Sequence, residues 1–268
     1  QRSAALAPVD ALVRLSPTPL RRWARRGLAG RDVRVRTGPA AGLVVNPGRS
    51  NPDYALGVNE VPVQEALLAA LRPGLTVYDI GANIGFFTLL CARAVGSAGV
   101  VYSFEPAPDN AAVLVHNLAV NGLANAVLVG RAVSSSSGFS ELWLAEYSGG
   151  HALELAGRPP DAAGQLRVET VSVDDFVAAG ARPPDVVKID VEGAETAVLA
   201  GMTRTLGEHR PVVLYEVDDG DAAALAAKRD AIDEILRGHD YTVRALPDSY
   251  GGSGWLVSHG LAEPVERR

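Results

Sequence analysis

The sequence predicts an α/β fold built on a mainly parallel, doubly wound sheet, and two observations carry this prediction. From about residue 61 onward, short β-branched segments alternate with helical segments, which is the pattern of βαβ units. Acidic residues also fall at or near the ends of four predicted strands, namely Asp79, Glu105, Asp190 and Glu216. Since such sheets bind ligands beyond the carboxyl ends of their strands, these acids are expected to gather at a binding site.

The elements of the first half follow from apolar spacing and from the Gly and Pro residues that end them. Segment 61–74 has helical spacing and stops at the helix-ending pair Pro73-Gly74. The strands predicted after it are 75–81, 99–106 and 125–133, and the helices between them are 86–96 and 107–122.

The second half begins with a serine-rich turn at 134–138 and a hairpin that pairs 139–150 with 165–173. Then follow a short helix 174–180, a strand 183–193, one helix 194–209, a strand 210–217 and a helix 221–240. Segment 241–258 reads as two antiparallel strands around a glycine turn.

Composition and charge narrow the class of protein. The chain has 268 residues and a net charge of −6, which argues against a general nucleic-acid binder, since that class needs a broad basic footprint. No apolar run reaches the roughly 18–20 residues that span a bilayer, so no integral membrane segment is expected. The single cysteine, Cys91, excludes an internal disulfide and fits a reducing compartment. With no signal-peptide pattern at the start, a cytoplasmic location is expected. The oligomeric state is left open.

Residues 1–60 differ from the rest and are predicted to form an N-terminal cap or lead-in segment. They hold seven arginines between Arg21 and Arg36, followed by a turn-rich stretch. This run is typical of a solvated face, with an anionic-ligand or membrane-surface patch as the alternative.

The segment TVYDIGANIGFF, residues 76–87, places a glycine turn directly after a strand. A dinucleotide fingerprint needs glycines where Asn83 and Phe86 stand, and no Gly-Lys-Ser/Thr follows, so neither nucleotide loop fits. An acid before the turn, Asp79, would repel a pyrophosphate but suits an ammonium group. Glu105 ends the next strand, where an acid accepts hydrogen bonds from ribose hydroxyls. A ribose together with an amino-acid ammonium describes S-adenosylmethionine.

Three stretches resemble the FkbM-type S-adenosylmethionine-dependent methyltransferases, namely VYDIGANIGFFTLLCARAVG, VYSFEPAPDNAAVLVHNLAVNG and VVKIDVEGAETAVLAGM. With Tyr54 to Glu60 before them and Glu216 after them, the resemblance covers roughly residues 54–216. It implies a class I methyltransferase (Rossmann-like) fold: a seven-stranded mixed sheet with one antiparallel strand and helices on both faces. Residues 61–268 would then be the S-adenosylmethionine-binding domain.

The cofactor contacts are expected along the strand ends. Asp79 would meet the methionine ammonium directly or through water, and Glu60 would close over the same end. Gly81 and Gly85 would let the cofactor approach, while Asn83 would bond the methionine part or hold the turn. The residues after the third strand would flank the adenine. The expected set is Glu60, Asp79, Gly81, Asn83, Gly85, Glu105, Arg131, Ala132, Val133 and Asp190.

The expected catalytic residues are Asp190, Glu192 and His151. A hydroxyl acceptor must lose a proton, so Asp190 or Glu192 could act as the base or orient the acceptor, or both could merely cap the next helix. His151 is a further base candidate on a glycine-flanked loop.

A divalent ion shared by Asp190 and Glu216 is the rival means of activating the acceptor. The sequence offers no histidine close to either acid, so a metal-free route is favoured and no metal ligand is expected.

The function expected is methylation of a hydroxyl on a small-molecule acceptor, and the resemblance implies a sugar or a secondary metabolite, as in natural-product biosynthesis. N-methylation of an amine is the nearest alternative. A nicotinamide-dependent oxidoreductase is disfavoured, because Asn83 and Phe86 stand where the dinucleotide-binding fingerprint needs glycines. A silent cofactor-binding scaffold is disfavoured because the acidic strand ends are intact.

Overall fold

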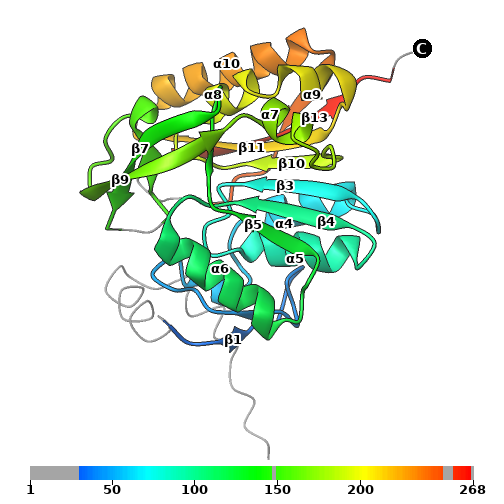
Figure 1. The fold of residues 1–268 in the computed structure, drawn as a ribbon, viewed down its shortest axis with the longest axis vertical. Coiled ribbons are helices and arrows are strands. Elements are labelled where there is room, and N and C mark those ends of the chain that lie inside the picture. The colour runs from blue at the N-terminus through cyan, green and yellow to red at the C-terminus, as the bar shows by residue number, and fades with distance from the viewer. Residues whose placement is uncertain (1–29, 147–148, 250–255, 267–268) are drawn as a thin grey trace, which may run out of the picture.

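The computed structural model describes residues 30–146, 149–249 and 256–266, and its centre is a seven-stranded mixed sheet (Figure 1). Six strands run in the same direction, and only β13, which lies between β11 and β12, runs antiparallel to them. The order is β12 (Tyr241–Ala245), β13 (Leu256–Pro264), β11 (Val212–Asp219), β10 (Val186–Ile189), β3 (Thr76–Ile80), β4 (Val100–Phe104) and β5 (Ala126–Val129). The class I methyltransferase sheet is therefore confirmed.

Helices cover both faces of this sheet, as Figure 1 shows. One face carries α4 (Val61–Ala70), α5 (Phe86–Val95) and α6 (Pro108–Val120). The other carries α7 (Val173–Ala178), α8 (Glu195–Ala200), α9 (Thr203–Glu208) and α10 (Ala222–Gly238).

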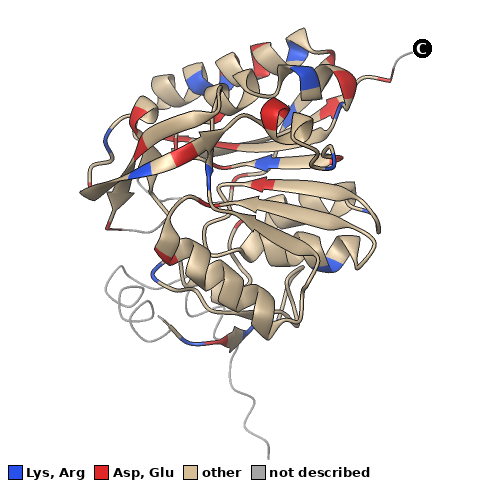
Figure 2. Ribbon diagram, viewed as in Figure 1, with Lys and Arg blue, Asp and Glu red and all other residues tan. Residues whose placement is uncertain are grey.

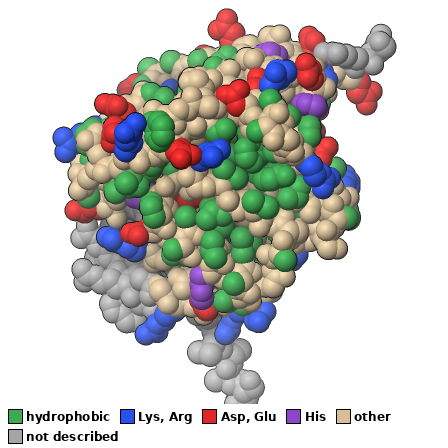
Figure 3. All heavy atoms as spheres, viewed as in Figure 1, with side chains coloured by type: hydrophobic (Ala, Val, Ile, Leu, Met, Phe, Trp, Pro, Cys, Tyr) green, Lys and Arg blue, Asp and Glu red, His purple; other side chains and the backbone are tan. Residues whose placement is uncertain are grey.

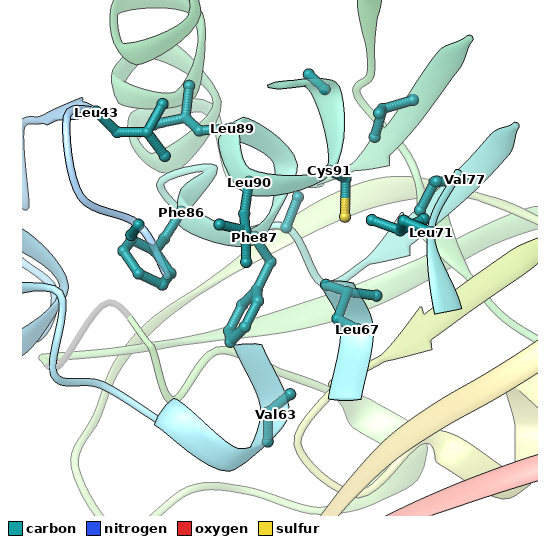
Figure 4. Packing of buried hydrophobic residues seen from close by; sticks show 14 of the residues in the cluster. Leu43, Val63, Leu67, Leu71, Val77, Phe86, Phe87, Leu89, Leu90 and Cys91 are labelled. Carbon is teal, nitrogen blue, oxygen red and sulfur yellow. The ribbon is translucent and has the colours of Figure 1, made fainter. Parts of the chain in front are cut away.

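The alternation of side chains along the central strands feeds these two cores. Val77 on β3 packs in the cluster under α4, α5 and α6, whereas Tyr78 and Ile80 pack in the cluster under the other helices. Figure 4 shows the first cluster, in which Cys91 lies among apolar side chains. Cys91 is fully buried there, so its thiol serves packing.

A second, four-stranded sheet is inserted between β5 and α7. It consists of β6 (Ala132–Val133), β9 (Ala162–Val171), β7 (Gly138–Ala145) and β8 (Ala152–Leu153). The predicted hairpin is confirmed as the antiparallel pair β7 and β9. The single strand predicted over 125–133 is wrong, because the chain leaves the main sheet after β5 and β6 pairs with β9 instead. Because β6 has only two residues, its sequence is too short to show the alternation of apolar and polar side chains that would mark it as a separate strand.

The helix predicted over 194–209 is also divided, into α8 and α9. The division falls at Gly201, where an added Cβ would clash with the backbone carbonyl of Ser134. This close approach of two backbones is a tertiary contact, so helical spacing in the sequence does not reveal it.

The described part of the N-terminal segment packs on the domain rather than standing apart. It contains β1 (Val33–Arg34), β2 (Val44–Val45) and α3 (Asp53–Leu56). Two asparagines of α6 and its C-terminus hold it: the backbone N–H of Val44 donates to Asn121 Oδ1 at 2.8 Å, and that of Asn46 donates to Asn117 Oδ1 at 2.7 Å. Most of the arginine run lies outside the described residues.

Two surface features complete the fold. None of the helices among the described residues is long and apolar enough to cross a membrane.

Figure 3 shows hydrophobic side chains gathered near the centre of one face. Exposed valines of β5 and α6 include Val127, which is 46% exposed on the edge strand β5.

Candidate active site

The glycine turn after β3 is shaped by its neighbours. Gly81 has φ +82°, and a Cβ there would clash with the carbonyl oxygen of Asp190. Gly85 has φ +85°, and a Cβ there would lie 2.8 Å from the Leu114 side chain. Both glycines therefore allow backbone approach to other parts of the chain. Gly81 also lines the main pocket, whereas Gly85 is not among its lining residues.

Glu105 follows β4 and presents a fixed carboxylate to this pocket. Its oxygens accept hydrogen bonds from the backbone N–H groups of Asn83 and Ala107, each at 2.8 Å. The side chain is buried, and burial raises the pKa of Glu105 to about 7, although the two backbone donors act in the opposite direction. A carboxylate held in this way can accept further hydrogen bonds from a ligand hydroxyl.

The structure brings most of the sequence-predicted residues to one open pocket. Its lining includes Gly81, Asn83, Glu105, Ala132, Val133, His151, Asp190 and Glu192. Glu60, Asp79, Gly85 and Arg131 are not part of the lining. Arg131 is about half exposed and forms an ion pair with Glu169 at 2.9 Å.

Asp79 lies beneath the turn, fully buried. Its Oδ2 accepts a hydrogen bond from Thr88 Oγ1 at 2.6 Å, and burial raises its pKa while Lys188 opposes the shift. Its Oδ1 and the Oδ1 of Asn83 are buried without a hydrogen-bond partner among the described residues. The Asn83 amide nitrogen, by contrast, donates to Ser50 Oγ at 3.1 Å. Two acceptors near this turn are thus left for a donor that the described residues do not supply.

Lys188 is a functional candidate that the sequence reading missed. It is buried on β10 and stands directly opposite Asp79 of β3 in the parallel register; Figure 2 shows a blue and a red band side by side in these strands. Its Nζ donates to Asp190 Oδ2 at 2.8 Å. Burial lowers the pKa of Lys188, but Asp190, Asp79 and Glu60 outweigh this, so the pKa lies above its ordinary value. The signal was a lysine inside an otherwise apolar strand.

A second missed residue is His259 on β13, which stands directly opposite Glu216 of β11 in the antiparallel register. Its Nε2 lies 2.5 Å from Glu216 Oε2 and 3.7 Å from Glu60 Oε2. Burial lowers the pKa of His259, yet the two carboxylates raise it further, to about 10. The expectation that no histidine lies close to Glu216 is wrong, because strand pairing joins residues 43 positions apart.

Glu192 and His151 both line the pocket. Burial raises the pKa of Glu192 well above its ordinary value, as do the nearby carboxylates of Asp218 and Asp190. His151 Nδ1 accepts a hydrogen bond from the backbone N–H of Ala145 at 3.0 Å, and burial lowers the pKa of His151. Its neutral ring then carries the proton on Nε2. His151 is therefore a hydrogen-bond donor through Nε2, and the raised pKa of Glu192 favours a protonated carboxyl group that can donate as well.

Comparison with known proteins shows the family to which the chain belongs. Residues 79–243, more than half of the chain, match the family described as Methyltransferase FkbM domain. Hexuronic acid methyltransferase AglP of Haloferax volcanii is 30% identical over 185 residues, covering 66% of this chain and 72% of that protein. 31-O-demethyl-FK506 methyltransferase FkbM of Streptomyces tacrolimicus is 30% identical over 206 residues, covering 66% of this chain and 76% of that protein.

Among solved structures, Methyltransferase FkbM from Methylobacillus flagellatus KT is similar with a TM-score of 0.49 and 18% identity. The match covers 78% of this chain and 52% of that chain, so this chain spans about half of the crystallised protein. The fold assignment rests on the strand order described above, and the family assignment rests on the sequence matches. The chain belongs to the FkbM methyltransferase family and is an S-adenosylmethionine-dependent methyltransferase.

Proposed function

We propose that the chain methylates a hydroxyl group of a sugar or a secondary metabolite. The observation that carries the proposal is the position of Asp190, which lines the same pocket as Glu105 and is anchored by Lys188. The acceptor class is supported by the names of the two relatives, one of which refers to hexuronic acid and the other to 31-O-demethyl-FK506.

The pocket residues fit S-adenosylmethionine in chemistry. Glu105 offers a fixed carboxylate for the ribose hydroxyls, and Ala132 and Val133 offer apolar wall for the adenine. The Oδ1 atoms of Asp79 and Asn83 lack hydrogen-bond donors among the described residues, and an ammonium group supplies such donors. We therefore assign Asp79 and Asn83 to the methionine end, with Asp79 acting directly or through water.

Asp190 takes the proton of the acceptor in this proposal. When bound, S-adenosylmethionine supplies a methyl group on a positively charged sulfur. Lys188 Nζ donates a hydrogen bond to Oδ2 of Asp190, whereas Oδ1 has no hydrogen-bond partner in the part of the chain that the structure describes. Oδ1 can accept the hydroxyl proton, which would make the acceptor oxygen a stronger nucleophile toward the methyl group. The remaining task of the pocket is to align the acceptor.

Glu192 and His151 then orient the acceptor instead of accepting its proton. His151 can donate a hydrogen bond from Nε2, and the raised pKa of Glu192 favours a protonated carboxyl group that can donate as well. Donors around the pocket suit the oxygen atoms of a sugar or a polyhydroxylated metabolite. The cap role of residues 1–60 and the cytoplasmic location stay predictions beside this proposal.

The test is methyl transfer from isotopically labelled S-adenosylmethionine to a panel of hexuronic acids, hydroxylated macrolides and matched small amines. Mass spectrometry and NMR would locate the label. The proposal expects the label on oxygen, with no transfer to analogues in which that hydroxyl is replaced by hydrogen. Transfer only to amines would favour N-methylation and contradict the proposed acceptor.

A further inference from the structure

We propose that Glu60, Glu216 and His259 form a binding site for a divalent transition-metal cation, beside the methyl-transfer pocket. One carboxylate oxygen of each glutamate and one ring nitrogen of the histidine lie within 4.8 Å of one another. The three residues come from the start of α4, from β11 and from β13, so the ion would join the lead-in segment to the sheet. This role goes beyond methyl transfer.

The sheet fixes two of the three ligands. Glu216 and His259 are directly paired across β11 and β13, which places their side chains on one face of the sheet. The next residue, Gly260, stands so close to the Tyr215 ring that a Cβ there would clash with it. The strand therefore lies tight against its neighbour and holds the imidazole in place.

A chain of buried amides orients the third ligand. Asn59 Nδ2 donates to Glu60 Oε1 at 2.5 Å, while Asn59 Oδ1 accepts from Asn51 Nδ2 at 3.1 Å. Gln64 Nε2 donates to the carbonyl oxygen of Asn59 at 2.5 Å. These bonds hold one oxygen of Glu60 and direct the other, Oε2, toward His259. Support of a ligand by outer hydrogen bonds is a regular feature of metal sites.

The charge of the surroundings also favours a cation. Four carboxylates, those of Glu60, Asp79, Asp190 and Glu216, gather around Lys188 and His259. Four acidic side chains face two basic ones there, which leaves an excess of two acidic groups. Proteins neutralise such a buried excess with protons or with a bound cation, and three converging donor atoms provide a place for the cation.

The donor set indicates the class of ion. A small cavity borders Glu216, His259 and Lys188, so there is space beside the ligands. Two carboxylate oxygens and one imidazole nitrogen suit Mn²⁺ to Zn²⁺ better than Mg²⁺, which prefers oxygen ligands alone. The site differs from an Asp190–Glu216 pair, because Asp190 is bonded to Lys188.

The experiment is a titration of the full chain, stripped of metal with EDTA and exchanged into clean buffer, with MnCl₂. Calorimetry and the loss of the free Mn²⁺ electron paramagnetic resonance signal would report binding. One Mn²⁺ per chain is expected, with micromolar affinity, tighter binding than Mg²⁺ and a higher melting temperature. Glu216→Gln and His259→Gln should each weaken Mn²⁺ binding at least about tenfold.

The matched control is Glu263→Gln, which removes the same charge from an exposed position of β13 and should bind Mn²⁺ like the wild type. If either ligand variant fails to fold, Glu60→Gln replaces it, since Glu60 makes no side-chain cap on α4. Circular dichroism would check each fold.

Two outcomes overturn the proposal. One is that the wild-type chain binds no Mn²⁺, in which case Glu60, Glu216 and His259 form only an ion-pair cluster. The other is binding that is unchanged in Glu60→Gln, Glu216→Gln and His259→Gln, which places the ion elsewhere. The titration uses neither S-adenosylmethionine nor an acceptor, so its failure is independent of the proposed function. A parallel titration with S-adenosylhomocysteine shows whether these variants lose cofactor instead of Mn²⁺.

Discussion

The two ends of the pocket hold their carboxylates by different means. At one end, backbone N–H groups of Asn83 and Ala107 hold Glu105. At the other end, a side-chain cation does this work, because Lys188 holds Asp190. Both acids directly follow strands of one sheet, so the secondary structure does not explain the difference.

The two ways of holding a carboxylate suit two different tasks: Glu105 binds the cofactor, and Asp190 accepts the proton of the acceptor. A carboxylate fixed by backbone donors keeps its geometry without any partner charge, which suits recognition of neutral hydroxyl groups. A carboxylate that is hydrogen-bonded to a buried lysine through one oxygen keeps its other oxygen for an acceptor, which suits acceptance of a proton. Changes at the Glu105 end should therefore alter affinity, and changes at the Asp190 end should alter turnover.

The largest effect is expected from Asp190→Asn. The amide oxygen can still accept from Lys188, but it cannot take the hydroxyl proton, so kcat should fall about 10²–10⁴-fold. Steady-state kinetics with the acceptor found in the screen would measure this. The affinity for S-adenosylhomocysteine should stay near that of the wild type. Normal turnover of this variant would make Asp190 a structural residue.

The next effect is expected from Glu105→Ala. Loss of charge-assisted hydrogen bonds to the ribose should weaken S-adenosylhomocysteine binding by roughly 1–3 kcal/mol in calorimetry. The control is Asp109→Asn, which removes an exposed carboxylate four positions along the chain. Equal affinity of wild type and Glu105→Ala would refute the ribose assignment.

A smaller effect is expected from pH. Burial raises the pKa of Glu105 to about 7, and ribose hydroxyls bond best to the ionised form. Below pH 7, binding must release a proton, so affinity falls with falling pH. The affinity for S-adenosylhomocysteine should therefore rise about tenfold from pH 6 to pH 8 and level off above that. Glu105→Gln should flatten the profile, and an unchanged slope in this variant would assign the titration to another group.

The smallest effect is expected from Glu192→Gln. Burial and its acidic neighbours raise the pKa of Glu192, which favours the protonated form, and glutamine can replace that form as a donor. We expect kcat to change less than about tenfold, in contrast to the loss that removal of a base causes. A loss as large as that of Asp190→Asn would transfer the role of base to Glu192.

The sequence predicted the features that depend on local patterns. The main strands, the helices on both faces and the antiparallel end of the sheet follow from apolar spacing and from Gly and Pro positions. The pocket positions of Glu105 and Asp190 follow from their places at strand ends. Local spacing was enough there because parallel strands bring their carboxyl ends to one edge.

The features that were missed depend on contacts between distant parts of the chain. The pairing of Glu216 with His259 comes from strand register, and the break at Gly201 comes from the backbone of Ser134. Asp79 was placed correctly at its strand end, but its side chain points into the interior, where Thr88 binds it. A strand end shows where a residue lies along the sheet and does not fix which face its side chain takes.

A crystal structure of the chain with S-adenosylhomocysteine tests the central claim most directly, because it needs no acceptor. The account predicts the ribose hydroxyls within hydrogen-bonding distance of Glu105, the adenine against Ala132 and Val133, and the sulfur on the Asp190 side of the pocket. A ribose bonded to other residues, or a sulfur remote from Asp190, would contradict the division into a binding end and a chemical end.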